Sequence, residues 1–319
     1  MLFKLLKYPS KLALLFFCRH IIIQNKKVLN HNGPLLIACN HPNSFLDAII
    51  LAALFKKPIY SLARGDVFKN KRIAKILIAL NILPVFRITE GAENLNTNYD
   101  TFAKCREIFK NNGIVLIFSE GLCVNEWKLR ALKKGTARLA FSAWNEGLDL
   151  TVIPAGINYQ SFRSFGKNVQ LNFGAPILNQ HFNKTETEGV NIKLFNEQLK
   201  TALKSLVVEI ESHQKETIKN TFHIKQHPIK KSMLHIPAIL GKLIHAPLFI
   251  PVHKLSWKYF EKMDHYDSVV VGLLFLLYPF YLLIISSILF ALLGSWYWLL
   301  AFIILPFLAW SFIQLKKQF

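Results

Sequence analysis

Short apolar runs alternate with longer mixed segments between residues 20 and 210. Gly, Pro and Asn bound these runs, which is typical of strands. The predicted strands are GPLLIACN (33–40), PIYSLAR (58–64), NILPVFR (81–87), GIVLIFSE (113–120), LTVIPAGINY (150–159) and VQLNFGAPI (169–177). Helices are predicted at 46–56, 68–80, 99–111, 129–146 and 190–213. This alternation predicts an α/β fold with a mixed, largely parallel sheet covered by helices.

Binding sites in such sheets form at the carboxyl ends of the strands. Four polar side chains follow or end the first four predicted strands: His41, Arg64, Arg87 and Glu120. We therefore expect these four side chains to lie along one edge of the sheet, where they are the first candidates for chemistry or substrate binding.

The apolar pattern changes near both ends of the chain. Residues 268–315 contain no Lys, Arg, Asp or Glu, and one bilayer crossing takes about 20 apolar residues. This length predicts a transmembrane helical hairpin with its turn at Gly294 and Ser295; the alternative is a hairpin buried in a soluble core. Lys and Arg interrupt the apolar N-terminus, which predicts an interfacial helix over residues 1–24 with a break at Pro9.

Composition strengthens the membrane interpretation. The chain has 39 Lys and Arg against 19 Asp and Glu, yet 52% of its residues are hydrophobic and the mean hydropathy is +0.29. Basic and apolar residues together favour an anionic membrane surface over nucleic acid. Residues 214–267, rich in Lys, are predicted to be a basic membrane-proximal segment. The positive-inside bias places the domain at 25–213 of this multi-pass protein on the cytoplasmic face.

The stretch NHPNSFLDA (40–48) places a histidine and a carboxylate at the start of a predicted helix. Ser44 and Asp47 fit a capping box, in which Asp47 only begins the helix. Alternatively, the preceding loop folds back so that His41 hydrogen-bonds Asp47. Such a pair makes a general base, because the acid orients the imidazole and stabilises its protonated form. The residue types alone favour neither interpretation.

Four motifs, in order, resemble those of the glycerolipid acyltransferase family, typified by the lysophosphatidate acyltransferases. The family motifs are NH-x-x-x-x-D, a strand ending in Arg, FPEGTRS, and a strand of the type VIPVAI. Their counterparts here are NHPNSFLD (40–47), NILPVFR (81–87), FSEG (118–121) and VIPAGI (152–157), and LKKGTARLAF (132–141) also fits the family pattern. The resemblance covers about residues 25 to 180.

The first and third motifs depart from the family pattern. Five residues rather than four separate His41 from Asp47, so the loop must absorb one more residue; the family's glycerol-3-phosphate/dihydroxyacetone-phosphate branch has a similar spacing. The third motif reads SEGLCV (119–124) and lacks the usual Pro, Thr and Arg. The missing Arg puts the usual phosphate ligand in doubt, and the candidate replacements are Lys128, Arg130, Lys133 and Lys134.

The resemblance implies acyl transfer from a thioester directly to a glycerol hydroxyl, without a serine or cysteine nucleophile. His41 is then the general base and Asp47 orients it. The implied substrate-binding residues are Arg87 for an acceptor phosphate, Arg64 as a weaker phosphate ligand, Glu120 for a glycerol hydroxyl or for organising basic residues, and Gly121, near which backbone N–H groups stabilise the oxyanion.

The resemblance also implies the substrates and partners. Acyl-CoA or acyl-carrier protein donates the acyl group, and lysophosphatidate or glycerol 3-phosphate accepts it at the membrane, in phospholipid biosynthesis. No metal, cofactor or nucleic acid is expected, since the four cysteines have no close spacing and no nucleic-acid motif occurs. Two alternatives stay open: a lyso-aminolipid acceptor, because the third motif is altered, and a non-catalytic membrane scaffold in which Asp47 only caps a helix.

Overall fold

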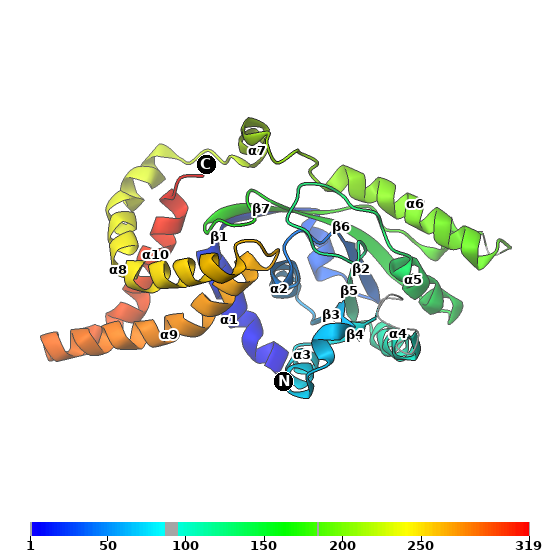
Figure 1. Ribbon diagram of the computed structural model, residues 1–319, viewed down its shortest axis with the longest axis horizontal. Helices are drawn as coiled ribbons and strands as arrows, with labels where there is room; N and C mark the ends of the chain where they lie inside the picture. Colours follow the sequence, from blue (N-terminus) through cyan, green and yellow to red (C-terminus); the bar gives the residue numbers. More distant parts are fainter. Residues whose placement is uncertain (1, 87–94, 184, 319) are drawn as a thin grey trace.

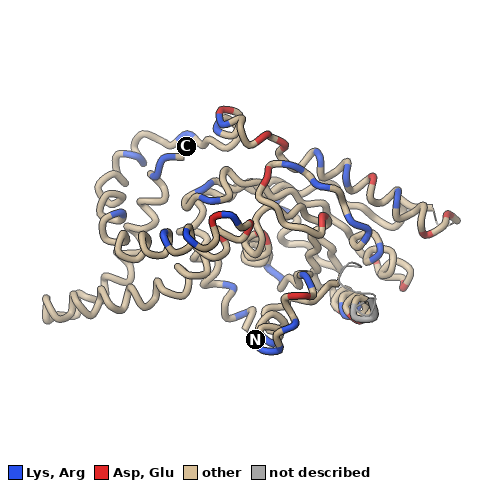
Figure 2. Tube along the Cα trace, in the orientation of Figure 1, with Lys and Arg blue, Asp and Glu red and all other residues tan. Residues whose placement is uncertain are grey.

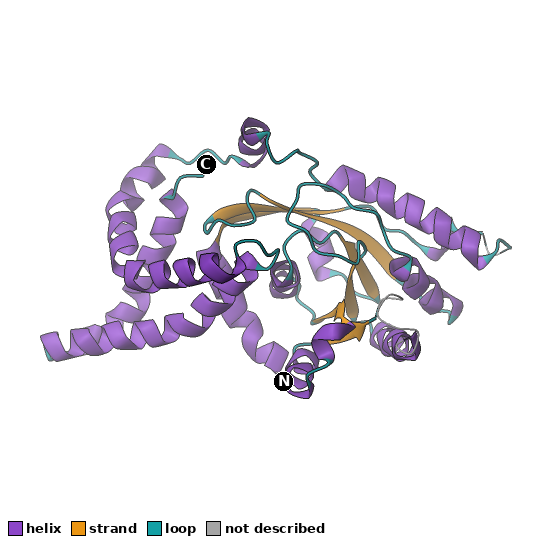
Figure 3. Cartoon of the chain, in the orientation of Figure 1, coloured by secondary structure: helices purple, strands orange, loops and turns teal. Residues whose placement is uncertain are grey.

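A seven-stranded sheet forms the centre of the molecule in the computed structural model, which describes residues 2–86, 95–183 and 185–318 (Figures 1 and 3). The strand order is β1-β7-β6-β2-β5-β3-β4. The bounds are Cys18–Gln24 (β1), Leu35–Cys39 (β2), Ile59–Arg64 (β3), Ile82–Val85 (β4), Ile114–Phe118 (β5), Thr151–Tyr159 (β6) and Lys167–Phe173 (β7). Neighbouring strands are parallel except β6 and β7. The predicted fold class is confirmed.

Helices cover both faces of the sheet, and β2 shows why. All five residues of β2 are fully buried, and successive side chains point to opposite faces. Leu35, Ile37 and Cys39 pack with residues of α1 (Leu2–Phe17), α2 (Phe45–Leu54) and the first turns of α9 (Tyr266–Leu293). Leu36 and Ala38 pack with α4 (Leu95–Lys110), α5 (Gly135–Asn145) and α6 (Glu188–Leu206). A strand buried on both faces therefore reads as a continuous apolar run.

Three helical segments of the described chain are long and apolar enough to cross a membrane. They are α8 (Pro228–Phe260), α9, and residues 296–315, which end in α10 (Ala301–Leu315). They lie beside the sheet, and Figure 2 shows no acidic or basic residue along the outer part of α9. The last two are the predicted helix pair, and Gly294 ends α9 in a left-handed conformation with φ 58°.

The helix α8 differs from the expectation for residues 214–267, which predicted only a basic membrane-proximal segment. A short helix, α7 (Lys215–Phe222), precedes α8, and α8 carries three internal prolines. α10 packs mainly against α8 rather than α9. Gly241 makes this possible, because a Cβ there would lie 2.1 Å from the carbonyl oxygen of Leu308. Small residues permit such close helix packing, so α8 joins the predicted pair in one bundle.

The N-terminal segment also differs from its prediction. Residues 18–24, expected in the interfacial helix, form the edge strand β1 and pair with β7. The run Ile21–Ile23 is β-branched, which favours a strand. The helix α1 continues through Pro9 rather than breaking there. It packs against α2, α9 and α10, and this packing offsets the backbone hydrogen bond that proline cannot make.

Two predicted helices are shorter than expected because hydrogen bonds fix the chain at one end of each helix. The helix predicted at 129–146 begins at Gly135, since the loop before it is tied to the turn after β5: Lys133 N donates to Ser119 O at 2.7 Å. The helix predicted at 190–213 ends at Leu206. The Leu206 carbonyl oxygen accepts hydrogen bonds from the side-chain amides of Asn158 and Asn172, each at 2.9 Å. α3 (Lys71–Ala79) lies within its predicted range of 68–80.

The contact between β6 and the end of α6 leaves no space for a side chain at Gly156. A Cβ there would lie 2.4 Å from the Leu206 carbonyl oxygen. We expect Gly156→Ala to lower the free energy of unfolding by about 1–3 kcal/mol, because α6 must move away from the sheet. Gly189→Ala, in α6 with nothing within 4 Å, is the control and should not destabilise. Denaturant unfolding in detergent measures both, and equal stabilities would contradict this packing.

Candidate active site

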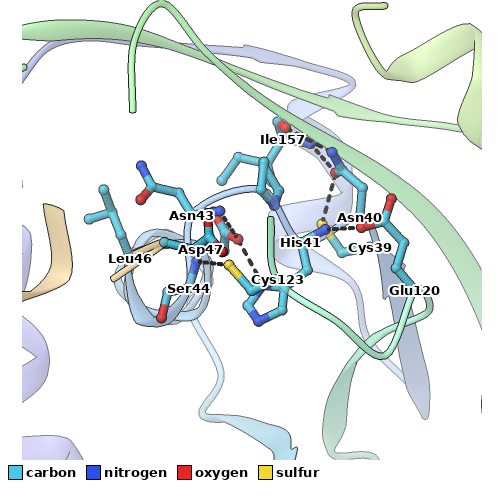
Figure 4. Close-up of polar contacts among 12 residues, drawn as sticks. Cys39, Asn40, His41, Asn43, Ser44, Leu46, Asp47, Glu120, Cys123 and Ile157 are labelled. Atoms are coloured by element: carbon cyan, nitrogen blue, oxygen red, sulfur yellow. Dashed lines mark hydrogen bonds and ion pairs between the residues drawn. The ribbon is translucent and has the colours of Figure 1, made fainter. Parts of the chain in front are cut away.

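The loop that follows β2 carries the candidate site, and its first residue is fixed to the sheet. Asn40 is buried and pairs with the backbone of Ile157 in β6. Its Nδ2 donates to the Ile157 carbonyl oxygen at 3.1 Å, and its Oδ1 accepts the Ile157 N–H at 2.8 Å (Figure 4). The amide thereby continues the pairing of β2 with β6 by one residue. His41 consequently leaves the sheet at a defined position.

His41 and Asp47 lie in direct contact. The Nδ1 atom of His41 is 2.9 Å from Asp47 Oδ2 (Figure 4). The Asp47 carboxylate is fully buried, and it also accepts hydrogen bonds from the Asn43 N–H at 2.9 Å and the Tyr159 hydroxyl at 2.7 Å. The imidazole stacks on the Phe118 ring, with ring centroids 3.8 Å apart. The sequence interpretation in which the loop folds back onto the helix is therefore the observed geometry.

The helix-start interpretation holds in part. Ser44 is the N-cap residue of α2, as the capping box requires, but its side chain makes no cap hydrogen bond. Its Oγ lies 2.6 Å from His265 Nδ1 instead. The Asp47 carboxylate accepts the Asn43 N–H, one residue before the cap, and the same carboxylate contacts His41. The five-residue spacing is therefore compatible with the contact, and the loop turns at Ser44, which has a φ of 54°.

This geometry favours base chemistry at His41 Nε2. A carboxylate at Nδ1 accepts the Nδ1–H, so the lone pair lies on Nε2. The His41 side chain is 19% exposed, and a neutral imidazole takes a proton from an alcohol within hydrogen-bond reach. Within residues 2–86, 95–183 and 185–318, no group of His, Cys, Asp or Glu has an arrangement that could hold a metal ion.

One thiol close to this pair, that of Cys123, is poorly suited as a nucleophile. Cys123 Sγ accepts the Ser44 N–H at 3.0 Å. Burial, and secondly the Asp47 charge, raise the pKa of Cys123 well above its ordinary value. Because the thiolate is the reactive form of cysteine, a protonated Cys123 is a poor nucleophile.

Glu120 connects the site loop to the loop that follows β5. Its Oε2 accepts the His41 N–H at 3.1 Å and its Oε1 accepts the Arg130 N–H at 2.9 Å. The side chain is 4% exposed. Burial raises the pKa of Glu120, and the two N–H donors partly offset that rise. Both carboxylate oxygens therefore accept backbone N–H groups. The predicted contact of Glu120 with a glycerol hydroxyl stays a prediction.

Gly121 forms a turn after β5, and the predicted oxyanion donors near it stay a prediction. Its φ is 63°, a conformation that glycine adopts readily. The Gly121 N–H donates to the Phe118 carbonyl oxygen at 3.0 Å. A Cβ at this position would lie 3.1 Å from Lys133 Cγ. The turn thus brings the exposed Lys133 next to the site, while the amide of Gly121 itself is engaged in the turn.

The predicted phosphate ligands fall into three groups. Arg64 lies at the carboxyl end of β3, on the predicted sheet edge, but its exposed guanidinium pairs with Asp66. Arg87 lies outside the described residues. Of the candidate replacements for the missing Arg, Arg130 pairs with Glu126 at 2.6 Å, whereas Lys128, Lys133 and Lys134 are exposed. The structure brings together His41, Asp47 and Glu120, and it leaves the phosphate ligand a prediction.

Sequence reasoning missed two groups of residues around Asp47. Tyr159 donates to its carboxylate, and the only signal for it was a polar end to the apolar run at 150–159. The second group precedes and begins α9: Asp264, His265 and Asp267 contact the site loop or its neighbour. Their signal was the presence of acidic residues at the edge of the charge-free segment, which also fits an ordinary membrane boundary.

Comparison with known proteins agrees with the sequence motifs. Residues 20–158 match the model of the family described as Acyltransferase. Among solved structures, the chain is similar to the 1-acyl-sn-glycerophosphate (LPA) acyltransferase PlsC from Thermotoga maritima. The TM-score is 0.44 at 16% identity, over 64% of this chain and 79% of that one. No curated protein matches the chain. The resemblance to the acyltransferase family is confirmed for residues 20–158.

The buried bond between Tyr159 and Asp47 provides a stability test. Burial, and secondly Asp47, raise the pKa of Tyr159 well above its ordinary value, so the phenol keeps its proton and donates it. We expect Tyr159→Phe to lower the free energy of unfolding by about 1.5–3 kcal/mol, because a buried carboxylate loses a donor. Tyr99→Phe, at a tyrosine that is 74% exposed, is the control. Unchanged stability of Tyr159→Phe in denaturant titrations would argue against this bond.

Proposed function

We propose that the acyltransferase-family segment at residues 20–158 transfers a fatty acyl group from an acyl thioester to a hydroxyl of a glycerolipid acceptor at a membrane. The observation that carries the proposal is the bond between His41 and Asp47, at the carboxyl end of β2, inside the segment that matches the family. The acceptor is lysophosphatidate or glycerol 3-phosphate, the donor is acyl-CoA or acyl-carrier protein, and the reaction belongs to phospholipid biosynthesis.

In the proposed reaction His41 first accepts a proton and later returns it. Nε2 takes the proton of the acceptor hydroxyl as its oxygen attacks the thioester carbonyl carbon. The resulting imidazolium is stabilised by Asp47 at Nδ1. The tetrahedral intermediate collapses by breaking the C–S bond, and the thiolate leaves with the proton from Nε2. The products are an ester and a free thiol, and no metal or redox cofactor takes part.

The acceptor phosphate needs a cationic partner near this base. Arg87 is the first candidate, because the family motif ends its second strand with an Arg and a guanidinium binds phosphate through parallel bonds. Lys133 is the second, since it packs over Gly121 next to the site. A lyso-aminolipid without a phosphate is the alternative acceptor, because the third motif lacks its Arg. A non-catalytic scaffold is less well supported, since a scaffold has no need of a histidine that contacts a buried carboxylate.

Membrane attachment keeps the acceptor within reach of the site. The three apolar helical segments support association with a membrane, and the positive-inside bias orients the catalytic domain toward the cytoplasm. The helix α3 adds a second contact with the bilayer surface. It has no buried residue; Ile73, Ile76 and Leu77 share one side, and the basic residues share the other. Such a helix lies in the headgroup region of an anionic bilayer.

Removal of the His41 imidazole tests the proposed general base. His41→Ala should lower kcat by about 10²–10⁴-fold, the usual contribution of a general base, while the protein stays folded and membrane-bound. Purified protein in lipid is offered labelled acyl-CoA or acyl-carrier protein with glycerol 3-phosphate, lysophosphatidate or a lyso-aminolipid. His213→Ala, at an exposed histidine, is the matched control. A folded wild-type protein that acylates none of these acceptors would favour the scaffold.

Two substitutions in α3 test its proposed contact with the bilayer surface. Ile76 and Ile78 are each 55% exposed but lie on different sides of the helix. Ile76→Glu should raise the apparent KM for an acceptor embedded in anionic vesicles roughly fivefold, because about 1 kcal/mol of apolar burial in the bilayer is lost. Ile78→Glu, on the basic side, should leave that KM unchanged, and a short-chain acceptor in solution should show no effect of either variant. Equal effects of the two variants would contradict this orientation.

A further inference from the structure

A segment outside the acyltransferase match forms hydrogen bonds with the catalytic loop, the loop after β2 that carries His41, and with the start of α2. This α9 entry segment comprises residues 264–268, which lie more than 100 positions after the last matched residue. In Figure 1 the start of α9 lies near α2, and the two helices are in contact. The contacts are Asn43 Nδ2 to Asp267 Oδ2 at 2.7 Å, Ser44 Oγ to His265 Nδ1 at 2.6 Å, Leu46 N to Ser268 Oγ at 3.3 Å, and Asn125 N to Asp264 Oδ1 at 2.9 Å.

These contacts reach the catalytic pair through Asn43. The backbone N–H of Asn43 donates to Asp47 Oδ2, and its side chain donates to Asp267 Oδ2. Asn43 has no exposed surface and Asp267 is 1% exposed. The chain of hydrogen bonds therefore runs from Asp267 through Asn43 to Asp47 and then to His41. A shift of Asp267 moves a direct donor to the carboxylate that orients the base.

The charge of Asp267 is itself held in place from the sheet. Lys167, at the start of β7 and fully buried, pairs with Asp267 Oδ2. A buried carboxylate needs both a counter-charge and donors, and Lys167 and Asn43 supply them. The position of Asp267 is thus set on one side by the sheet and on the other by the catalytic loop, so this residue connects the two.

His265 acts on the neighbouring position of the loop. Ser44 has a φ of 54° and a ψ of −136°, a backbone conformation that residues with a Cβ rarely adopt and that surrounding contacts must hold. The His265 imidazole binds the Ser44 hydroxyl, and the Ser44 N–H is bound by Cys123. A tether that served only to attach α9 would need none of these contacts at a strained loop residue.

We propose that His265 and Asp267 are positioning residues that hold the His41–Asp47 pair in its reactive geometry, so that acyl transfer requires the membrane helix α9 to be docked on the catalytic loop. This inference rests on the proposed function. It adds that the membrane helix is part of the catalytic machinery rather than only an anchor.

His265 provides the cleanest variant, because it is exposed and its loss leaves no buried charge. We expect His265→Ala to lower kcat at least roughly tenfold, since small displacements of catalytic groups are costly, while KM for both substrates stays within about twofold. His265→Asn, which can place a hydrogen-bonding atom near the Nδ1 position, should restore most of the activity.

Two further variants separate positioning from stability. Met263→Ala, at an exposed neighbour of the α9 entry segment, should match the wild-type protein. The double variant Asp267→Asn with Lys167→Met removes both buried charges together, so neither is left unpaired. It should lower kcat as His265→Ala does. Thermal unfolding of every variant is measured in the same lipid, so that loss of folded protein is not counted as loss of kcat.

A readout without catalysis distinguishes this inference from the proposed function. The rate at which diethylpyrocarbonate modifies His41, followed by peptide mass spectrometry, should rise several-fold in His265→Ala, while modification of His31 stays unchanged as an internal reference. If the wild-type protein transfers no acyl group but His41 becomes more reactive in the variant, the positioning role stands and the proposed function fails. If the wild-type protein transfers an acyl group, and neither kcat nor His41 reactivity changes in His265→Ala and the double variant, the positioning role is overturned and the proposed function stands.

Discussion

A fully buried carboxylate at the start of α2 is the constraint on which the rest of the site depends. A charge without exposed surface is stable only when hydrogen-bond donors surround it. Asp47 has three: the His41 imidazole, the Asn43 N–H and the Tyr159 hydroxyl. They come from the loop after β2 and from β6, so both must reach their native positions before the carboxylate is satisfied. The same interaction stabilises the fold and creates the candidate base.

The surrounding elements fix the position of the His41 backbone and the orientation of its ring. Asn40 extends the pairing of β2 with β6, and Glu120 joins the His41 backbone to the loop before α5. These contacts hold the first two residues of the loop at the sheet edge, and the imidazole stacks on Phe118 at the end of β5. Each of these groups binds backbone or a ring rather than solvent. The site is built to keep one side chain in one orientation, which is what a general base requires.

The N-terminal helix α1 and the long apolar helix α9 pack against the domain that holds the candidate site. α1 and the first turns of α9 contribute buried residues to the core on one face of the sheet, together with α2. The pair of Lys167 and Asp267 connects β7 to α9 beneath the catalytic loop. A helix that only crossed a membrane would need apolar length alone, whereas α9 and the residues just before it share core and polar contacts with the segment that holds the candidate site. The packing of α9 and the geometry of the candidate site therefore depend on the same side chains.

Local pattern in the sequence determined most of the fold. Six strands followed from bounded apolar runs, two long apolar helices followed from a charge-free segment, and the pairing of His41 with Asp47 was one of two interpretations of a single motif. Tertiary structure alone decided the features that depend on distant partners. Residues 18–24 form a strand because β7 pairs with them, and α8 packs as a third apolar helix because Gly241 meets α10. Tyr159, His265 and Asp267 act on the site from positions over 100 residues away along the chain. Periodicity reports the environment of one segment, whereas a hydrogen bond between distant side chains exists only after the chain has folded and brought them together.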